Sequence, residues 1–366
     1  MGRFTGLITG LMLWLVSFAT PSSATDFAKP GPFAVGRQEF TIPGTTSSRA
    51  IPFVIWYPAA AAPDPNAEVL DSTKDAPAAT TGPYPLVVVI HGQAGTGSMF
   101  GPVAQYFASY GIGVVAANFD DDVDPWIRKL PSVNWPPLRR LYVRPADVVR
   151  LIDDVETLNA PGGKLAGVID TSHIGVWGMS TGGTTAFQAA GAQLDLKAMD
   201  DWCAQHKTEY EATYETCKFV GTEHILAQQY GIADPFAGPL PALWDKRVAA
   251  LVAVAPGGEL HVFGDKGIAA VNVPALIMVA ADDNVVSPEY NGLWAYGGIG
   301  SQTKTLAIFD HGGHTWLMKS APHLANSTAL ATAFFLAILK GNTDARAALM
   351  PQAVSLPSVI YKTTLH

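Results

Sequence analysis

The sequence predicts an α/β fold, in which helices cover both faces of a mostly parallel central sheet. Short, continuously apolar segments alternate with longer segments of helical periodicity, as expected for strands buried on both sides. The 366 residues are 48% hydrophobic and 15% charged, so the chain can bury a large core. The formal charge is −8 without a cluster of Lys and Arg, which argues against a nucleic-acid-binding surface.

The first 24 residues have the features of a secretory signal peptide. Arg3 precedes the apolar run GLITGLMLWLVSFAT, and Ser22 and Ala24 stand at positions −3 and −1 of the expected cleavage site. The run is short for a membrane span, so an N-terminal anchor is the less favoured alternative. We expect a secreted protein, extracellular or periplasmic, whose domain of residues 25–366 does not insert into a membrane.

The first half of this domain opens with two extended segments. Residues 33–42 and 50–59 flank the turn-like sequence PGTTSS and predict two antiparallel strands. Residues 59–83, rich in Ala, Pro, Asp and Thr, predict a surface loop. A strand, a helix, a strand and a long loop are then expected at residues 84–92, 99–110, 111–119 and 120–137.

The second half continues the alternation. A helix is predicted at residues 144–158, where Val148, Leu151, Ile152 and Val155 fall on one face. SHIGVWGM predicts a strand, and TTAFQAAGA predicts the helix after it. Three apolar strands and a long apolar helix follow at residues 248–256, 273–281, 303–310 and 329–339.

An insertion, residues 193–246, interrupts the alternation where a helix normally returns directly to a strand. We expect it to be helical and to form a partial lid, with surface decoration as the alternative. It contains Cys203 and Cys217, and an oxidising compartment favours a disulfide between them. A metal site with His206 would need further ligands, and a catalytic thiol does not suit such a segment.

The sequence GMSTGG contains a G-x-S-x-G motif centred on Ser180. Such a motif also arises by chance in a chain with 35 glycines, so its surroundings decide its meaning. Ser180 falls between a predicted strand and a predicted helix, the context of a strained turn that presents a nucleophile. Gly178 and Gly182 remove side chains that would collide in this turn, and Gly183 lets helix and strand approach.

A glycine-rich loop follows the strand that ends in His91-Gly92. In a parallel sheet this loop lies at the same end as Ser180. The backbone amides of Gln93 and Thr181 are therefore expected to form an oxyanion hole. His91 is expected to brace the loop and not to act as a base.

An acid and a base follow the later strands. Asp282 and Asp283 come just after one predicted strand, and His311 and His314 come just after the next. Each residue type is common in loops. Their joint occurrence at successive strand ends, in the order Ser, Asp, His and with an oxyanion loop, predicts a hydrolytic triad.

The chain resembles the α/β-hydrolase superfamily and, within it, the Ser-type "predicted dienelactone hydrolase" group, related to platelet-activating-factor acetylhydrolases and cutinase-like polyester hydrolases. The resemblance covers most of the mature chain. It rests on the segments PGPFAVG, IWYPA, VVVIHGQAG, RPADVVRLIDDV, GMSTGG, AADDNVVSP and HGGHTWL. Met179 stands where many relatives have histidine. Ser180 replaces the cysteine of true dienelactone hydrolases, so the group's name does not identify the substrate.

The resemblance also favours one of the two adjacent aspartates and one of the two histidines. Relatives have a small residue, two further positions and then the catalytic acid, which favours Asp283 and leaves Asp282 as the alternative. They place Gly or Ala directly before the catalytic histidine, which favours His314 over His311. The implied triad is therefore Ser180, Asp283 and His314.

The implied activity is hydrolysis of carboxylic esters through an acyl-enzyme, without a metal or organic cofactor. Small-molecule, lipid-like and polyester substrates all fit it. An amidase or peptidase with the same triad is the alternative, and a noncatalytic binding protein is less favoured because every catalytic position is filled. The acidic run FDDDVD lacks an EF-hand pattern and is expected to be a solvated loop.

Three side chains are expected to contact the substrate. Trp126 and Trp316 lie in loops at the expected active end, and Met179 directly precedes the nucleophile. Ordinary aromatic packing is the alternative for both tryptophans.

Overall fold

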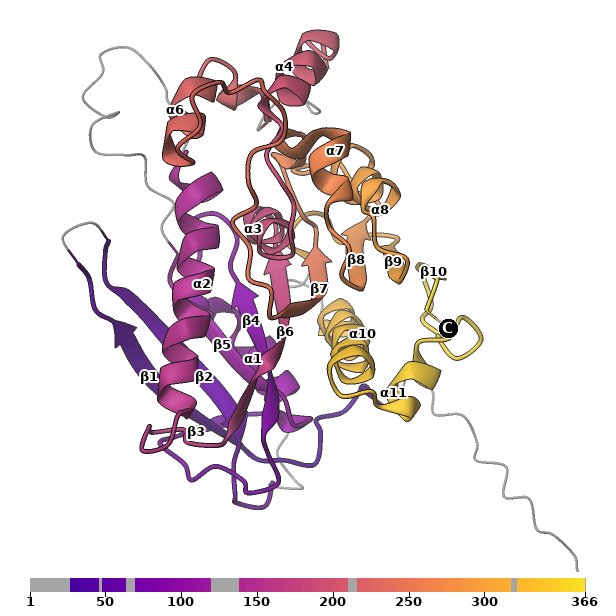
Figure 1. The fold of residues 1–366 in the computed structure, drawn as a ribbon. Helices are drawn as coiled ribbons and strands as arrows, with labels where there is room; N and C mark the ends of the chain where they lie inside the picture. The colour runs from indigo at the N-terminus through magenta and orange to yellow at the C-terminus, as the bar shows by residue number, and fades with distance from the viewer. Residues whose placement is uncertain are drawn as a thin grey trace, which may run out of the picture.

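A ten-stranded sheet organises the described part of the chain, residues 27–45, 48–63, 70–119, 138–209, 216–316 and 321–365 of a computed structural model (Figure 1). The expected signal peptide lies outside these residues. The strand order is β10-β9-β8-β7-β6-β4-β5-β2-β1-β3. The strands are β1 (Val35–Ile42), β2 (Ile51–Pro58), β3 (Ser72–Lys74), β4 (Tyr84–Ile90), β5 (Gly113–Ala117), β6 (Ile169–Met179), β7 (Val248–Val254), β8 (Ala275–Ala280), β9 (Lys304–Phe309) and β10 (Val359–Thr363).

The centre of the sheet, from β5 through β4, β6, β7 and β8 to β9, is parallel throughout. The prediction of an α/β fold with a mostly parallel sheet is thus confirmed, and the architecture is compatible with an α/β-hydrolase fold. In such a sheet all the loops that follow the strands emerge at one end. The loops after β4, β6, β8 and β9 contain the residues of the predicted triad and oxyanion hole.

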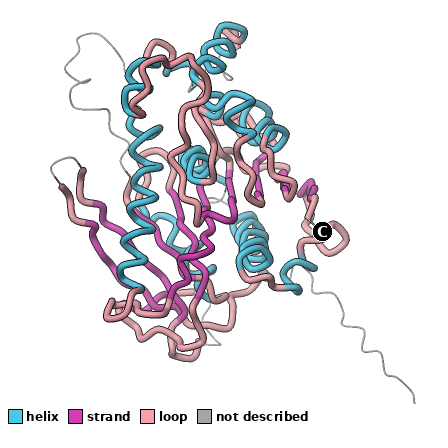
Figure 2. Tube along the Cα trace, viewed as in Figure 1, coloured by secondary structure: helices cyan, strands magenta, loops and turns pink. Residues whose placement is uncertain are grey.

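Helices cover both faces of the sheet, as Figure 2 shows. In β4, Leu86 and Val88 belong to the core on the side of α2 and α3, whereas Val87 and Val89 belong to the core on the side of α1 and α10. Burial on both sides explains the continuous apolar runs of these strands. The α-helices are α1 (Gly101–Ser109), α2 (Arg139–Asn159), α3 (Thr181–Ala189), α4 (Leu196–Gln205), α6 (Glu223–Gln229), α7 (Gly264–Ala269), α8 (Trp294–Gly298), α10 (Ala321–Leu339) and α11 (Thr343–Ala348).

The edges of the sheet contain its antiparallel pairs. β1 and β2 form the predicted opening pair. β3 lies within the predicted surface loop and pairs in parallel with β1, where the Arg37 guanidinium donates to the Ser72 carbonyl at 2.6 Å. β10 was not predicted because its half-buried and exposed side chains alternate without an apolar run. Its strand conformation comes from antiparallel pairing with β9.

Helix α2 begins at Arg139, earlier than predicted, and continues through Pro145. A proline leaves the carbonyl four residues before it without its helical partner. That carbonyl, of Leu141, accepts hydrogen bonds from the Gln188 amide at 2.7 Å and the Tyr230 hydroxyl at 3.0 Å. Side chains of α3 and of the insertion therefore compensate for the proline.

The insertion after α3 is helical, as expected, and contains α4, α6 and the 3-10 turn η4 (Thr216–Phe219). The Thr216 hydroxyl contacts the Gly258 carbonyl in the loop after β7 at 3.5 Å, so the insertion reaches the end of the sheet where the site residues lie. Cys203 and Cys217 form a disulfide, with their Cα atoms 5.6 Å apart. Neither sulfur is then available as a thiolate. The role of the insertion as a lid stays a prediction.

Helix α10 contains the window Pro322–Leu339, which is long and apolar enough to cross a membrane, with a mean hydropathy of 1.3. No segment of such length was expected beyond the N-terminus. Of this window, 67% is buried within the protein. The helix packs against β6, β7 and β8, and this burial accounts for its apolar composition.

An aromatic stack attaches α4 to the body of the domain. The ring of Trp202 lies 3.8 Å from that of His261, in the 3-10 turn η5 (Leu260–Phe263), and 4.4 Å from that of His206. Burial lowers the pKa of His261 to about 4. The folded protein therefore keeps this imidazole neutral at pH values where the unfolded chain would protonate it.

The disulfide predicts a loss of stability in Cys203→Ser. The bond closes a short loop with a sequence separation of 14, for which chain entropy predicts about 3 kcal/mol of stabilisation. We expect Cys203→Ser and the double Cys203→Ser/Cys217→Ser variant to lose this amount alike in thermal or denaturant unfolding. Two free thiols in non-reduced peptides of the exported protein, detected by mass spectrometry, would contradict the pairing.

The buried His261 predicts a pH-dependent stability. Its unfolded form takes up a proton near pH 6.5 and its folded form near pH 4, so the free energy of unfolding falls as the pH drops between these values. Protonation of His261 in the unfolded chain should lower the free energy of unfolding by about 2 kcal/mol between pH 7 and pH 5. Denaturant titrations at pH 7 and pH 5 measure this difference. The free energy of unfolding of His261→Phe should fall less between the two pH values than that of the wild type, whereas His173→Ala, a change at an exposed histidine, should behave like the wild type. Equal dependence in His261→Phe and the wild type would refute the assignment.

Candidate active site

Ser180 lies at the tight turn between β6 and α3. Its φ of 55° and ψ of −127° place it in a region that non-glycine residues rarely adopt. The Ser180 amide donates to the Val254 carbonyl at 3.0 Å, and its carbonyl accepts from Gly183 at 2.7 Å and Gly257 at 3.2 Å. These bonds hold the strained residue between a strand and a helix, in the turn that the sequence predicted.

The glycines around Ser180 are required by close backbone contacts. A Cβ atom on Gly178 would lie 2.1 Å from the Gly182 carbonyl oxygen, and one on Gly182 would lie 2.2 Å from the Ile90 carbonyl oxygen. A Cβ atom on Gly183 would lie 2.7 Å from Cβ of Pro256. Real Cβ atoms do not approach so closely, so only glycine permits this packing of β6, α3 and the neighbouring loops.

His314 connects Ser180 to Asp283. Its Nε2 lies 2.9 Å from Ser180 Oγ, and its Nδ1 lies 2.8 Å from Asp283 Oδ2. A carboxylate only accepts, so Nδ1 bears the hydrogen and Nε2 accepts the hydrogen of the serine hydroxyl. The His314 side chain is 12% exposed and that of Asp283 is 2% exposed. This arrangement can deprotonate Ser180 during attack on an electrophile.

Asp282 and Asp283 have different partners. Asp283 Oδ1 accepts from the amides of Val285 and Val286, both at 2.9 Å, which orients the carboxylate whose second oxygen meets His314. Asp282 instead accepts from the Gly313 amide at 2.8 Å and the Gly312 amide at 3.1 Å. The Gly313 bond foremost holds the pKa of the Asp282 carboxyl below its ordinary value. Asp282 therefore anchors the loop that presents His314.

His91 braces the loop after β4, as expected. Its Nε2 accepts from the Phe119 amide at 2.9 Å, so its Nδ1 bears the hydrogen and donates to the Gly92 carbonyl at 2.7 Å. A Cβ atom on Gly92 would lie 3.3 Å from Ser180 Cβ, so this loop borders the nucleophile. In the described ranges neither the Gln93 nor the Thr181 amide donates a hydrogen bond, which leaves both available to an oxyanion.

Arg144 is a further residue of the site, and its role was not predicted. It is completely buried, and its guanidinium donates to the His91 carbonyl at 2.9 Å and the Gly92 carbonyl at 3.3 Å. It thereby fixes the backbone that precedes Gln93. The only signal in the sequence is an arginine directly before Pro145, next to the apolar face of a helix.

The remaining predicted residues differ in their placement. Trp126 and most of the acidic run FDDDVD lie outside the described residues. Trp316 is completely buried with its ring 4.3 Å from that of Phe309, an arrangement that favours the packing alternative over a pocket wall. Met179 is 4% exposed beneath the turn. His311 is exposed and bonds to Asp310, and the structure does not bring it to Ser180.

The comparisons with known proteins add no relatives. A scan against protein-family models finds no match for this chain, and a search of the curated proteins finds none.

Proposed function

We propose that this protein is a secreted serine hydrolase of the α/β-hydrolase superfamily that cleaves carboxylic esters. The observation that supports this most directly is the imidazole of His314, hydrogen-bonded to Ser180 on one side and to Asp283 on the other. The strained turn at Ser180 and the order Ser, Asp, His at the carboxyl ends of β6, β8 and β9 support it further. The buried disulfide fits an extracellular protein.

The first half of the proposed reaction transfers the acyl group to the enzyme. Ser180 Oγ attacks the ester carbonyl carbon while His314 Nε2 takes the hydroxyl proton, and Asp283 stabilises the resulting imidazolium. The carbonyl oxygen becomes an oxyanion that accepts from the Gln93 and Thr181 amides, each worth about 3 kcal/mol. The carbon–oxygen bond to the alcohol then breaks, and His314 gives its proton to the leaving oxygen.

The second half regenerates the enzyme. His314 takes a proton from a water molecule that attacks the acyl carbon, and a second oxyanion forms in the same place. Collapse of this intermediate breaks the bond to Ser180 Oγ, which recovers its proton from His314. The products are an acid and an alcohol, and every proton is carried by His314.

Substitution of the proposed nucleophile should abolish turnover without unfolding the protein. Ser180→Ala removes one hydroxyl, no core volume and no backbone constraint, so thermal stability should stay close to that of the wild type. Hydrolysis of p-nitrophenyl esters should fall by roughly 10⁵- to 10⁶-fold in Ser180→Ala and nearly as much in His314→Ala, because these groups act as a unit. Wild-type turnover in folded Ser180→Ala would refute the nucleophile.

A reactive fluorophosphonate probe separates catalysis from simple binding. The wild type should be labelled on Ser180, whereas Ser180→Ala and a noncatalytic binding protein should not react. Matched ester and amide substrates of one acyl group, tested beside a polyester film, then define the substrate class. Faster cleavage of the amide would replace the esterase proposal with an amidase.

The different partners of the two neighbouring aspartates predict unequal effects. Asp283→Asn should lower kcat by about 10³- to 10⁴-fold, because an amide no longer selects the required tautomer of His314. Asp282→Asn retains one acceptor oxygen for the Gly312 and Gly313 amides, and His311→Ala removes a side chain that contacts no reacting atom. In each of these two variants kcat should fall by less than about ten-fold. Steady-state kinetics of the three folded variants test this. If Asp282→Asn were inactive and Asp283→Asn active, the acid of the triad would be Asp282 and not Asp283.

A further inference from the structure

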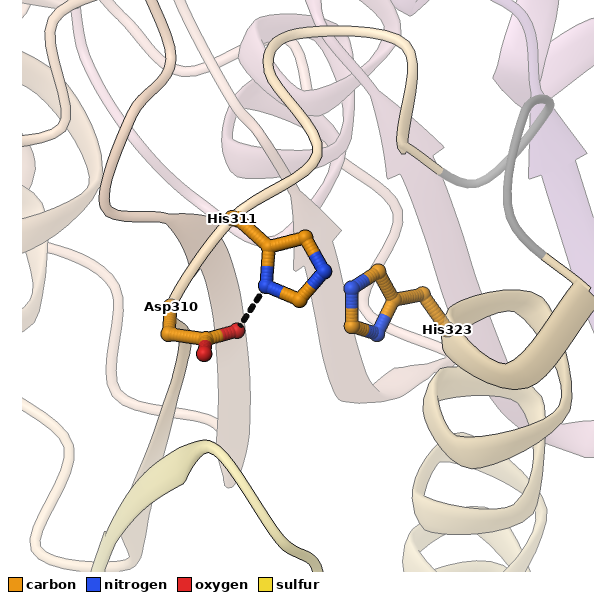
Figure 3. Close-up of side chains that lie close together, drawn as sticks. All are labelled: Asp310, His311 and His323. Atoms are coloured by element: carbon orange, nitrogen blue, oxygen red, sulfur yellow. Dashed lines mark hydrogen bonds and ion pairs between the residues drawn. The ribbon is translucent and has the colours of Figure 1, made fainter.

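Three side chains with metal-binding atoms lie close together where the loop that contains His314 begins. Asp310 and His311 follow β9, and His323 lies in the first turn of α10. One ligand atom from each lies within 4.8 Å of the others (Figure 3). Asp310 and His311 are hydrogen-bonded to each other, and Figure 3 shows a ring nitrogen of His323 turned toward the His311 imidazole.

His323 is the unusual member of this group. It is only 6% exposed, yet among the described residues neither of its ring nitrogens has a hydrogen-bond partner. Its ring is held by aromatic packing, 4.7 Å from the ring of His311 and 5.4 Å from that of Phe309. A buried polar group without a partner costs free energy, so this side chain indicates a ligand at the place it faces.

We propose that Asp310, His311 and His323 form a binding site for Zn²⁺ that is separate from the catalytic residues. Two imidazole nitrogens and one carboxylate oxygen suit this ion, and a water molecule would complete its tetrahedral coordination. Mg²⁺ and Ca²⁺ prefer oxygen ligands and are poorly matched by a pair of histidines.

The three ligands differ in mobility. Tetrahedral zinc holds its ligand atoms roughly 3.3 Å apart. The side chains of Asp310 and His311 are 48% and 66% exposed, so they can rotate toward the fixed imidazole of His323. The buried ligand thus defines the place of the ion, and the two exposed ligands close around it.

A bound ion would attach the His314 loop to helix α10. The same loop is already held by Asp282 through the Gly312 and Gly313 amides. Zinc at His311 would add a second attachment, and none of its three ligands contacts Ser180. Its expected effect is therefore on stability more than on the chemical step, and the site does not depend on the proposed esterase activity.

The test is titration of the chelator-treated mature protein with ZnCl₂, by calorimetry and thermal unfolding. We expect one ion per chain and a rise in Tm of roughly 3–6 °C at a hundred-fold excess over Kd. MgCl₂ and CaCl₂ at the same concentration should change nothing. His314→Ala should bind zinc like the wild type, which excludes the catalytic histidine as the ligand.

Variants of the three ligands decide the location. His311→Ala and Asp310→Asn change exposed side chains and should raise Kd at least ten-fold while the protein stays folded. His323→Phe fills the same buried space without nitrogens, so it should lose binding and match or exceed the wild-type Tm without metal. His173→Ala is the exposed control and should bind normally. Absence of saturable binding, or wild-type binding in His311→Ala and His323→Phe, would overturn the proposal.

Discussion

The backbone of Ser180 is the constraint on which the rest of the site depends. A non-glycine residue with a positive φ costs of order 1–3 kcal/mol and persists only where its surroundings enforce it. Here the Ser180 amide donates to a carbonyl of β7, and its carbonyl accepts from amides of α3 and of the loop after β7. Glycines at the close contacts around the turn leave room for this backbone. The same turn points the hydroxyl toward His314 and leaves the Thr181 amide without a partner in the described chain.

Polar side chains position the loops around this turn through their hydrogen bonds. Asp282 and Asp283 are adjacent, yet one anchors the glycines before His314 and the other orients its imidazole. Arg144 holds the carbonyls of His91 and Gly92 in the same manner. These hydrogen bonds compensate in part for the burial of the guanidinium, so the contacts that hold the loop also stabilise the buried charge.

Long-range hydrogen bonds also explain how the insertion joins the domain. Tyr230 donates to the Leu141 carbonyl that Pro145 leaves without a helical partner, and Trp202 stacks on His261. The insertion therefore supplies a hydrogen bond that α2 lacks, and its Thr216 contacts the Gly258 carbonyl in the loop after β7. Next to His311, His323 is a buried group without a hydrogen-bond partner in the described chain, and a bound ion would provide one.

The sequence by itself determined the α/β class, the antiparallel opening pair, the turn at Ser180 and the strand ends that Asp283 and His314 follow. Apolar runs and glycine spacing are local signals of burial and of backbone conformation, so a sequence contains them. The family resemblance favoured Asp283 and His314, and the tertiary structure showed that they are hydrogen-bonded to each other. Only the tertiary structure decided that α2 passes through Pro145, that Trp316 is core and that β10 pairs with β9. Each depends on partners distant along the chain, whose approach no local pattern specifies.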